Sequence, residues 1–453
     1  MSFDFCRQAV NVAIKAGAEE AETLLIERRS TTVQIERAEI KTATSSKDMG
    51  IGVRAITNRK MGFAYTNRIT ADAVEKTARV AARASRASLR DKNWRQLPEG
   101  KSYPTVKEVF DNRFAEVNSD EVVAFCIEMM EAAVNVDKRV LPAFGGVELE
   151  TQNMTCLNSH GLEVEDKGTD FVCYLGTMAR SETQVSPMCI EFQASRIYEP
   201  KQKWVGSETG RLAIQSINVG KAEGGKFPVL LDSFALESIF NATLIPSVRG
   251  DNVSRGNSKL KDKIGSKIAS DSLDLLDDGT RAGGLRSGKA DMEGVPRQRT
   301  PIIEKGRLHG FLYDNYWGRI EGKESTGNAG RGGGRLLLPP YGTLPTISPS
   351  NVVIEPGTAS EHELLAQVKN GYYVRDVQGA HQSNPETGEF SVAIAPAWRI
   401  LNGEITHAVK GAMIAGNLYD MINNISLVGK ESRQLGTFIT PKIVIDNLNV
   451  ITE

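Results

Sequence analysis

Residues 227–250 read FPVLLDSFALESIFNATLIPSVRG. The run at 227–231 is short and apolar, which is typical of a buried β-strand. Asp232 and Ser233 follow it, and either side chain can accept a hydrogen bond from the free N–H groups at the start of a helix. The next residues are apolar enough to form that helix. This stretch therefore predicts a strand that is followed directly by a buried helix.

The region before residue 100 predicts a helix, a β-meander and a second helix. Apolar residues recur at helical spacing over 3–16, and Gly17 ends that helix. Strand-like runs follow, and the last two are joined by a tight turn at 58–60. Thr70 then caps an alanine-rich helix that reaches about residue 89. The expected strands are AETLLIERRS (21–30), TVQIERAEIKTAT (32–44), GIGVRAITN (50–58) and MGFAYTN (61–67).

The later part of the chain moves from mixed elements to short strands. A helix is expected from Ser119, followed by strands and by another helix over 208–217. The expected fold class is α+β, with an N-terminal helix–β-meander–helix domain and a large, mainly antiparallel β C-terminal domain. The predicted divisions are 1–100 for the N-terminal α+β domain, 105–222 for a central α+β region and 223–453 for the β-rich C-terminal domain.

Charge and composition argue against several classes of protein. The net charge is −1, which disfavours broad electrostatic binding to nucleic acid or to an anionic membrane. The N-terminus does not read as a signal peptide, and no run of apolar residues is long enough to suggest a membrane span. The five cysteines are odd in number and lack C-x-x-C spacing, which favours reduced thiols. We therefore expect a cytoplasmic protein with no membrane partner.

The C-terminal part carries a distinctive combination of short motifs. Residues 371–374 read GYYV, His381 follows, and 384–391 read NPETGEFS, with GNL at 416–418 and ESTGNAGRGGGR at 324–335. Together these pieces resemble the signature of the TldD/PmbA metalloprotease family, which is also linked to modulation of DNA gyrase. The likeness extends along essentially the whole chain.

The resemblance also identifies the chemistry that this chain lacks. Catalytic members of the family carry H-E-x-x-x-H in the helix of the opening stretch, where it aligns with residues 241–246. The histidine positions are then Asn241 and Pro246, and the glutamate position is Ala242. These residues supply neither a metal-binding pair nor a general base. Catalytic members also have a cysteine ligand near the C-terminus, whereas residues 429–452 contain no Cys or His. The chain is therefore similar to the PmbA/TldE branch, which lacks the metal motif.

The resemblance implies a subunit of a cytoplasmic TldD-type metalloprotease complex. In this interpretation the chain takes part in proteolysis of unfolded peptides, which the family is proposed to capture as an added strand. The TldD-type partner carries the metal, expected to be zinc, and this chain has no metal, cofactor or catalytic residue of its own. One alternative is a homodimer that binds peptides or regulates another protein without hydrolase activity. Another is a hydrolase that uses unrecognised ligands such as Glu361, His362 and His381.

Several residues are expected to line the peptide cleft or to contact the partner. The glycine-rich run at 330–334 does not fit a phosphate-binding loop, because Pro339 and Pro340 prevent a helix from starting after it. Close approach to another chain is the expected role of this run. The basic residues between 249 and 267 alternate with aspartates and lack aromatic neighbours, so nucleic-acid binding is not expected there. The candidate contact residues are Arg281, Gly332, Gly333, His381, Asn384 and Asn417.

Overall fold

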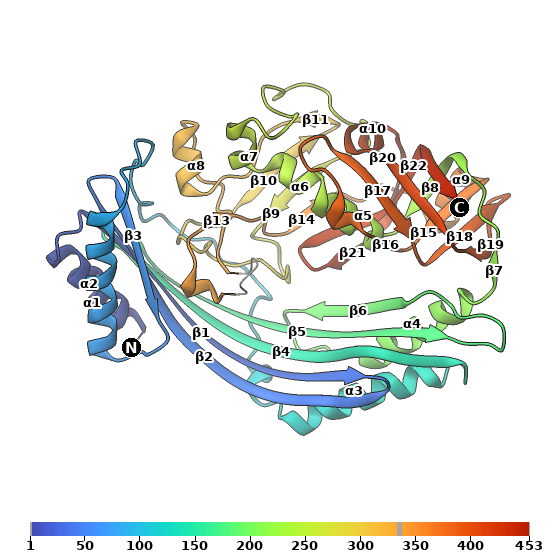
Figure 1. The fold of residues 1–453 in the computed structure, drawn as a ribbon, viewed down its shortest axis with the longest axis horizontal. Helices are drawn as coiled ribbons and strands as arrows, with labels where there is room; N and C mark the ends of the chain where they lie inside the picture. The colour runs from blue at the N-terminus through green and yellow to red at the C-terminus, as the bar shows by residue number, and fades with distance from the viewer. Residues whose placement is uncertain (1, 333–337, 453) are drawn as a thin grey trace.

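The computed structural model describes residues 2–332 and 338–452, and its N-terminal half is built on one curved antiparallel sheet (Figure 1). Two long hairpins supply most of this sheet, and their inner strands β1 and β4 pair with each other. The order across the sheet is β3-β2-β1-β4-β5-β6. These strands are β1 (Glu20–Glu36), β2 (Glu39–Thr57), β3 (Lys60–Thr66), β4 (Val140–Asn158), β5 (Glu163–Ala179) and β6 (Cys189–Ser195).

Helices cover one end and the outer face of this sheet. Figure 1 shows α1 and α2 at one end, and α3 on the face that points away from the C-terminal sheets. Helix α4 lies beside β5 and β6, and it packs against both α3 and the C-terminal sheet. The predicted cap of α2 is confirmed, because the Thr70 hydroxyl accepts a hydrogen bond from the backbone N of Ala73. The elements are α1 (Ser2–Lys15), α2 (Ala71–Ala87), the 3-10 helix η1 (Asn112–Ala115), α3 (Ser119–Val134) and α4 (Gln202–Gln215).

The turn between β1 and β2 lies at Arg37 and Ala38, inside the run that was predicted to be one strand over 32–44. Both residues have positive φ angles, 52° and 61°. Such turns normally contain Gly, Asn or Asp, which tolerate that conformation, so the sequence carried no turn signal here. The strand prediction was wrong at this point. The chain instead forms two long strands of 17 and 19 residues.

Helix α4 begins at Gln202, six positions before the predicted start at residue 208. Gly206 and Gly210 weaken the helical pattern in the sequence, because glycine is a poor helix former. Both glycines face α3, where a Cβ at Gly206 would lie 2.0 Å from the carbonyl oxygen of Met129. Tertiary packing between the two helices thus selects a helix that local propensity disfavours.

Replacing Gly206 with alanine is expected to lower the free energy of unfolding by about 2–3 kcal/mol, because the added methyl group must push α4 away from α3. Urea denaturation of the wild type and the variant measures this change. The Ser207→Ala variant is the control, since it puts an alanine on the same helix away from this contact; it should change the free energy by less than about 0.5 kcal/mol. Equal effects of the two variants would contradict the packing argument.

The C-terminal half is organised by a 14-stranded sheet. Its longest path is β11-β10-β9-β14-β22-β8-β15-β18-β19-β7, and most pairs in it are antiparallel. Strand β22 pairs with β8, β14, β20 and β21 and so connects the parts of the sheet. Its strands include β7 (Val219–Gly220), β8 (Gly225–Leu231), β9 (Leu275–Asp278), β10 (Arg299–Glu304), β11 (Arg307–Leu308), β14 (Val352–Ile354), β15 (Gly371–Val374), β16 (Val377–Gln378), β17 (Glu389–Ile394), β18 (Ala397–Leu401), β19 (Glu404–Val409), β20 (Ala412–Asn417), β21 (Ile425–Leu435) and β22 (Phe438–Thr452).

Short helices and one small sheet complete this half. The small sheet pairs β12 (Ala329–Gly330) with β13 (Thr346–Ile347). The helices are α5 (Ser233–Ala242), α6 (Leu244–Val248), α7 (Gly250–Arg255), α8 (Asn315–Ile320), the 3-10 helix η2 (Pro340–Gly342), α9 (Glu361–Val368), the 3-10 helix η3 (Ala380–Gln382) and α10 (Leu418–Asn423). Most of them pack apolar side chains against the large sheet in the main hydrophobic core. Helix α9 joins a second cluster, and Tyr341 of η2 packs against the N-terminal sheet.

The predicted α+β fold class is confirmed, including the helix–meander–helix unit at the N-terminus and the mainly antiparallel C-terminal part. Strands from 1–100 and from 105–222 share one sheet, and the division between these two ranges stays a prediction. All five cysteines are buried and free. Among the described residues, no helix combines the length and the apolar character needed to cross a membrane.

A buried ion network joins the two halves of the molecule. Arg54 on β2 is 2% exposed, and its Nη2 donates to Glu22 on β1 at 2.6 Å and to Glu293 at 2.8 Å. Arg331 pairs with Glu22 from the other side. Burial opposes the charge of Arg54, but the two carboxylates more than compensate and raise its pKa above the ordinary value. The N-terminal sheet is therefore held to the loop that carries Glu293 by buried ion pairs.

Candidate functional site

Helix α5 begins where β8 ends, as the opening stretch of sequence predicts. Asp232 is the cap, and its carboxylate accepts a hydrogen bond from the backbone N of Phe234. Ser233, the other candidate, instead donates its hydroxyl to the carbonyl oxygen of Thr440 at 2.8 Å. The cap and this contact fix α5 on the end of the large sheet.

The helix is interrupted within the stretch that aligns with the metal motif. Helix α5 ends at Ala242, and the short α6 starts at Leu244. Thr243 lies between them, and its hydroxyl donates to the carbonyl oxygen of Ile239 at 2.6 Å. Pro246 has no backbone N–H and could not bond to the Ala242 carbonyl in a continuous helix. The break in the turn before Pro246 follows from that missing donor.

These positions do not fit a catalytic metal. Asn241 is exposed, while Ala242 and Pro246 are half-buried and have no side-chain donor atom. Within residues 2–332 and 338–452, no three His, Cys, Asp or Glu side chains come together as a metal site. Glu361 is instead paired with Lys442, at 2.5 Å. The hypothesis of a metal bound by Glu361, His362 and His381 is therefore not supported by their placement.

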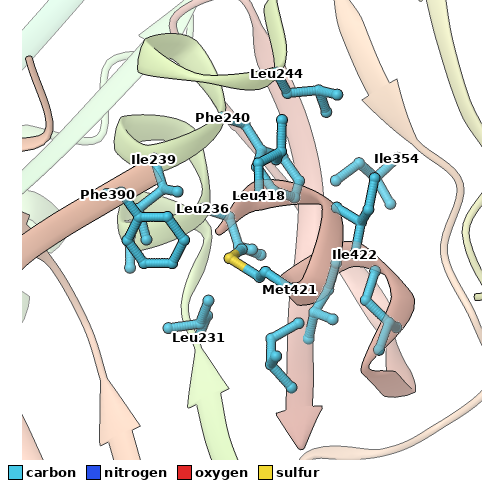
Figure 2. Close-up of a cluster of buried hydrophobic side chains, with 14 of the residues drawn as sticks. Leu231, Leu236, Ile239, Phe240, Leu244, Ile354, Phe390, Leu418, Met421 and Ile422 are labelled. Atoms are coloured by element: carbon cyan, nitrogen blue, oxygen red, sulfur yellow. The ribbon is translucent and has the colours of Figure 1, made fainter. Parts of the chain in front are cut away.

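Hydroxyl groups and α10 surround α6. The Ser247 hydroxyl donates to the carbonyl oxygen of Thr243 at 2.8 Å, and it lies 3.3 Å from the Tyr419 hydroxyl. Burial raises the pKa of Tyr419, although the contact with Ser247 acts in the opposite direction. Figure 2 shows the apolar contact beneath, where Phe240 from α5 approaches Leu418 from α10. The apolar packing and the hydroxyl contacts around α6 indicate that these residues have a structural role.

Three of the predicted contact residues lie close to helices α5 and α10. His381 is exposed on η3, which packs against α5. The Asn384 side chain accepts from the backbone N of Glu386 and that of Thr387, at 3.0 and 3.2 Å. Asn417 caps α10 and donates to the Thr387 carbonyl at 2.8 Å. The two asparagines thus hold one turn beside α10, and a contact with peptide or partner stays a prediction.

The other predicted contact residues lie elsewhere. Arg281 is exposed in the loop between β9 and β10. Gly332 lines a cleft of about 780 Å³ between the N-terminal sheet and C-terminal loops, and its backbone N donates to the Thr343 hydroxyl at 2.7 Å. Gly333 lies outside the described residues. The structure therefore does not gather the five described candidates into one site.

Three of the six basic residues in the predicted basic segment form ion pairs with its own aspartates. Arg249 and Arg255 both pair with Asp251, at 2.9 and 3.7 Å. Lys267 pairs with Asp271 at 2.9 Å. These ion pairs agree with the expectation of a solvated segment, and nucleic-acid binding remains unexpected there.

Three family models match this chain along most of its length. Residues 21–85 match PmbA/TldA metallopeptidase domain 1, residues 112–217 match the central domain, and residues 224–452 match the C-terminal domain. The last match alone spans about half of the chain. The chain belongs to the TldD/PmbA family. The predicted resemblance is confirmed.

Individual members of the TldD/PmbA family match over nearly their full lengths. An uncharacterized protein of Methanocaldococcus jannaschii is 30% identical, with 94% of this chain and 95% of that protein covered. Metalloprotease PmbA of Escherichia coli O157:H7 is 25% identical, with coverages of 97% and 95%. The crystal structure of TldE from Thermococcus kodakarensis superposes with a TM-score of 0.92 at 29% identity, covering 98% of this chain and 99% of that one.

A second buried ion network in this TldD/PmbA member was not predicted from the sequence. Arg375 donates to Asp232 at 2.5 Å and to Glu191 of β6 at 2.8 Å, and Arg433 also pairs with Glu191. Tyr373 donates its hydroxyl to Asp232 at 2.6 Å. Burial would raise the pKa of Asp232, but Arg375 and its cationic neighbours lower it below the ordinary value.

The signal for this network was present in the sequence but incomplete. Asp232 and Arg375 each follow an all-apolar run, and a charged residue at such a position needs a partner. Strands β8 and β15 are parallel, with Leu231 opposite Val374, so the next residue of each strand stands side by side. The sequence contains both residues, but only the pairing of the strands identifies them as partners.

Proposed function

We propose that this chain is the TldE-type, non-catalytic subunit of a TldD-type metallopeptidase assembly. The observation that carries the proposal is the set of side chains at the motif positions: Asn241, Ala242 and Pro246 offer no metal-binding pair and no general base. The break at Thr243 adds to it, since the helix is not continuous there. The close superposition with TldE of Thermococcus kodakarensis supports the same assignment.

In this assembly the TldD-type partner supplies the metal, expected to be zinc, and the general base. This chain contributes one wall of the space in which an unfolded peptide is held, and the reaction takes place on the partner. The cytoplasm is the expected location, and five buried free thiols fit a reducing compartment.

Co-expression with a TldD-type subunit tests the proposal. We expect cleavage of unfolded peptides by the co-purified pair, and activity at least about 100-fold lower for either chain alone, because each chain lacks part of the assembly. Elemental analysis of this chain alone should find far less than one transition metal per molecule. Ala242→Ser is the matched control in this chain, and it should leave the activity of the pair within about twofold, because position 242 carries no catalytic base.

Two results would overturn the proposal. Stoichiometric zinc together with chelator-sensitive cleavage by this chain alone would make it a complete enzyme. A homodimer that binds peptides but neither associates with a TldD-type chain nor changes its activity would favour the peptide-binding or regulatory alternative.

A further inference from the structure

An arginine-rich cleft lies apart from the degenerate metal motif. It is the cleft of about 780 Å³ that Gly332 lines, a volume typical of pockets for small ligands or for the end of a peptide. Arg28 from β1 reaches it from the N-terminal sheet, and Arg286 and Arg297 reach it from the segment between β9 and β10. Side chains from distant parts of the sequence therefore present positive charge to one space.

The lining arginines differ in how far their charge is neutralised. Arg331 is paired with Glu22, and the Nε of Arg28 lies 3.2 Å from Glu150. In contrast, no carboxylate of the described residues lies within ion-pair distance of Arg286 or Arg297. The Nη1 of Arg297 donates only to the carbonyl oxygen of Gly327, at 3.2 Å. These two guanidinium groups are the part of the cleft that is open to an anion.

The electrostatics of the surrounding groups agree with this view. Burial lowers the pKa of Arg297, whereas Asp291, Asp277 and Asp166 act in the opposite direction, and Arg286 adds a smaller lowering. Burial also raises the pKa of Glu150 to about 7 despite Arg28 and Arg286, so this carboxyl is only partly ionised at neutral pH and neutralises Arg28 only in part. An anion placed between two guanidinium groups interacts favourably with both positive charges.

The remaining walls suit a peptide better than a free phosphate. Leu338, Pro339 and Tyr341 give the cleft an apolar side. The carboxylate of Asp48 also lines it and accepts a hydrogen bond from the Tyr341 hydroxyl at 2.9 Å. A nearby fixed negative charge disfavours a dianion such as phosphate more than a single carboxylate. Guanidinium groups match the flat, two-oxygen geometry of a carboxylate.

We propose that this cleft binds the C-terminal carboxylate of a peptide through Arg286 and Arg297, with the preceding residues against Leu338, Pro339 and Tyr341. The inference extends the proposed function, because it names the end of the peptide that this chain holds. Its test uses binding by this chain alone, without a catalytic partner, so the two ideas can fail separately.

Fluorescence polarisation with a labelled octapeptide of glycine, alanine and serine tests the proposal. The peptide with a free carboxylate should bind at least about tenfold more tightly than the same peptide with a C-terminal amide, because a charge-assisted contact is lost. Arg286→Gln should weaken binding of the free acid about tenfold and leave binding of the amide unchanged. Arg286 is exposed, so this variant should fold normally. Arg297→Gln should have the same effect on binding, and circular dichroism checks that it is folded.

Arg299→Gln is the matched control. Arg299 is two positions from Arg297, but it is exposed and pairs with Glu355 outside the cleft lining, so both peptides should bind to this variant as to the wild type. Equal binding of acid and amide by the wild type, or equal binding by the Arg286→Gln and Arg299→Gln variants, would overturn the proposal. Wild-type binding weaker than about 1 mM would overturn it as well. Displacement of the free acid by inorganic phosphate at a similar concentration would indicate a general anion site and not a site for peptide ends.

Discussion

Replacing Arg54 with methionine is expected to lower the free energy of unfolding by about 3–5 kcal/mol. The substitution introduces an apolar side chain of similar length. Glu293, which is 1% exposed, then stays buried without its cation. Glu22 keeps Arg331, so the loss falls mainly on Glu293. Urea denaturation followed by tryptophan fluorescence measures the change, and Trp94 is a suitable reporter because its ring lies 5.6 Å from the Arg54 guanidinium.

Two further variants test the reason for this loss. The double variant Arg54→Met, Glu293→Gln should be more stable than Arg54→Met alone, because the neutral amide removes the unpaired charge. Arg7→Met is the control, since Arg7 forms an exposed pair with Glu163, and it should destabilise the protein far less than Arg54→Met does. The buried-network interpretation fails if Arg54→Met is no more destabilising than Arg7→Met.

Replacing Arg375 with methionine is expected to cost a similar 3–5 kcal/mol at pH 7, because Asp232 and Glu191 both lose a buried cation. This cost should depend on pH. The pKa of Asp232 is lowered in the folded protein, so its favourable contribution is present above its unfolded value of about 4 and is lost as the pH falls through the lower folded value. In the variant, burial without Arg375 should raise the pKa of Asp232 and allow protonation.

The difference in unfolding free energy between the wild type and Arg375→Met should therefore shrink as the pH is lowered from 7 to 4. Denaturation curves at several pH values measure this trend. Arg211→Met is the control, because Arg211 pairs with Glu208 on the surface of α4 and should give a small difference at every pH. A difference for Arg375→Met that stays constant with pH would show that lost packing against Phe234, and not lost charge, causes the effect.

Much of the local structure could be predicted from the sequence because its causes are local. Thr70 caps α2 by a bond that spans three residues, and Gly17 follows α1 with a φ of 96° that glycine adopts easily. The turn at Asn58 and Arg59 was also predicted and has positive φ angles at both residues. The turn at Arg37 and Ala38 was missed, because cross-strand pairing and not residue type stabilises it there.

The candidate site was predicted only in part. The side chains at Asn241, Ala242 and Pro246 can be read from the sequence alone, while their correspondence to the metal motif rests on the family resemblance and stays a prediction. The sequence did not place Gly332 in a cleft separate from His381 and Asn417, because residues that contact across the fold are far apart along the chain.

The sequence by itself determined the fold class and the family, since both depend on residue type and short spacing. Only the tertiary structure decided which charges meet. Asp232 meets Arg375 because two parallel strands align, Arg54 meets Glu293 across the two halves, and Arg286 and Arg297 share one cleft with Arg28. The physical reason is that a buried or clustered charge is stabilised by its neighbours in space, and those neighbours are set by long-range packing.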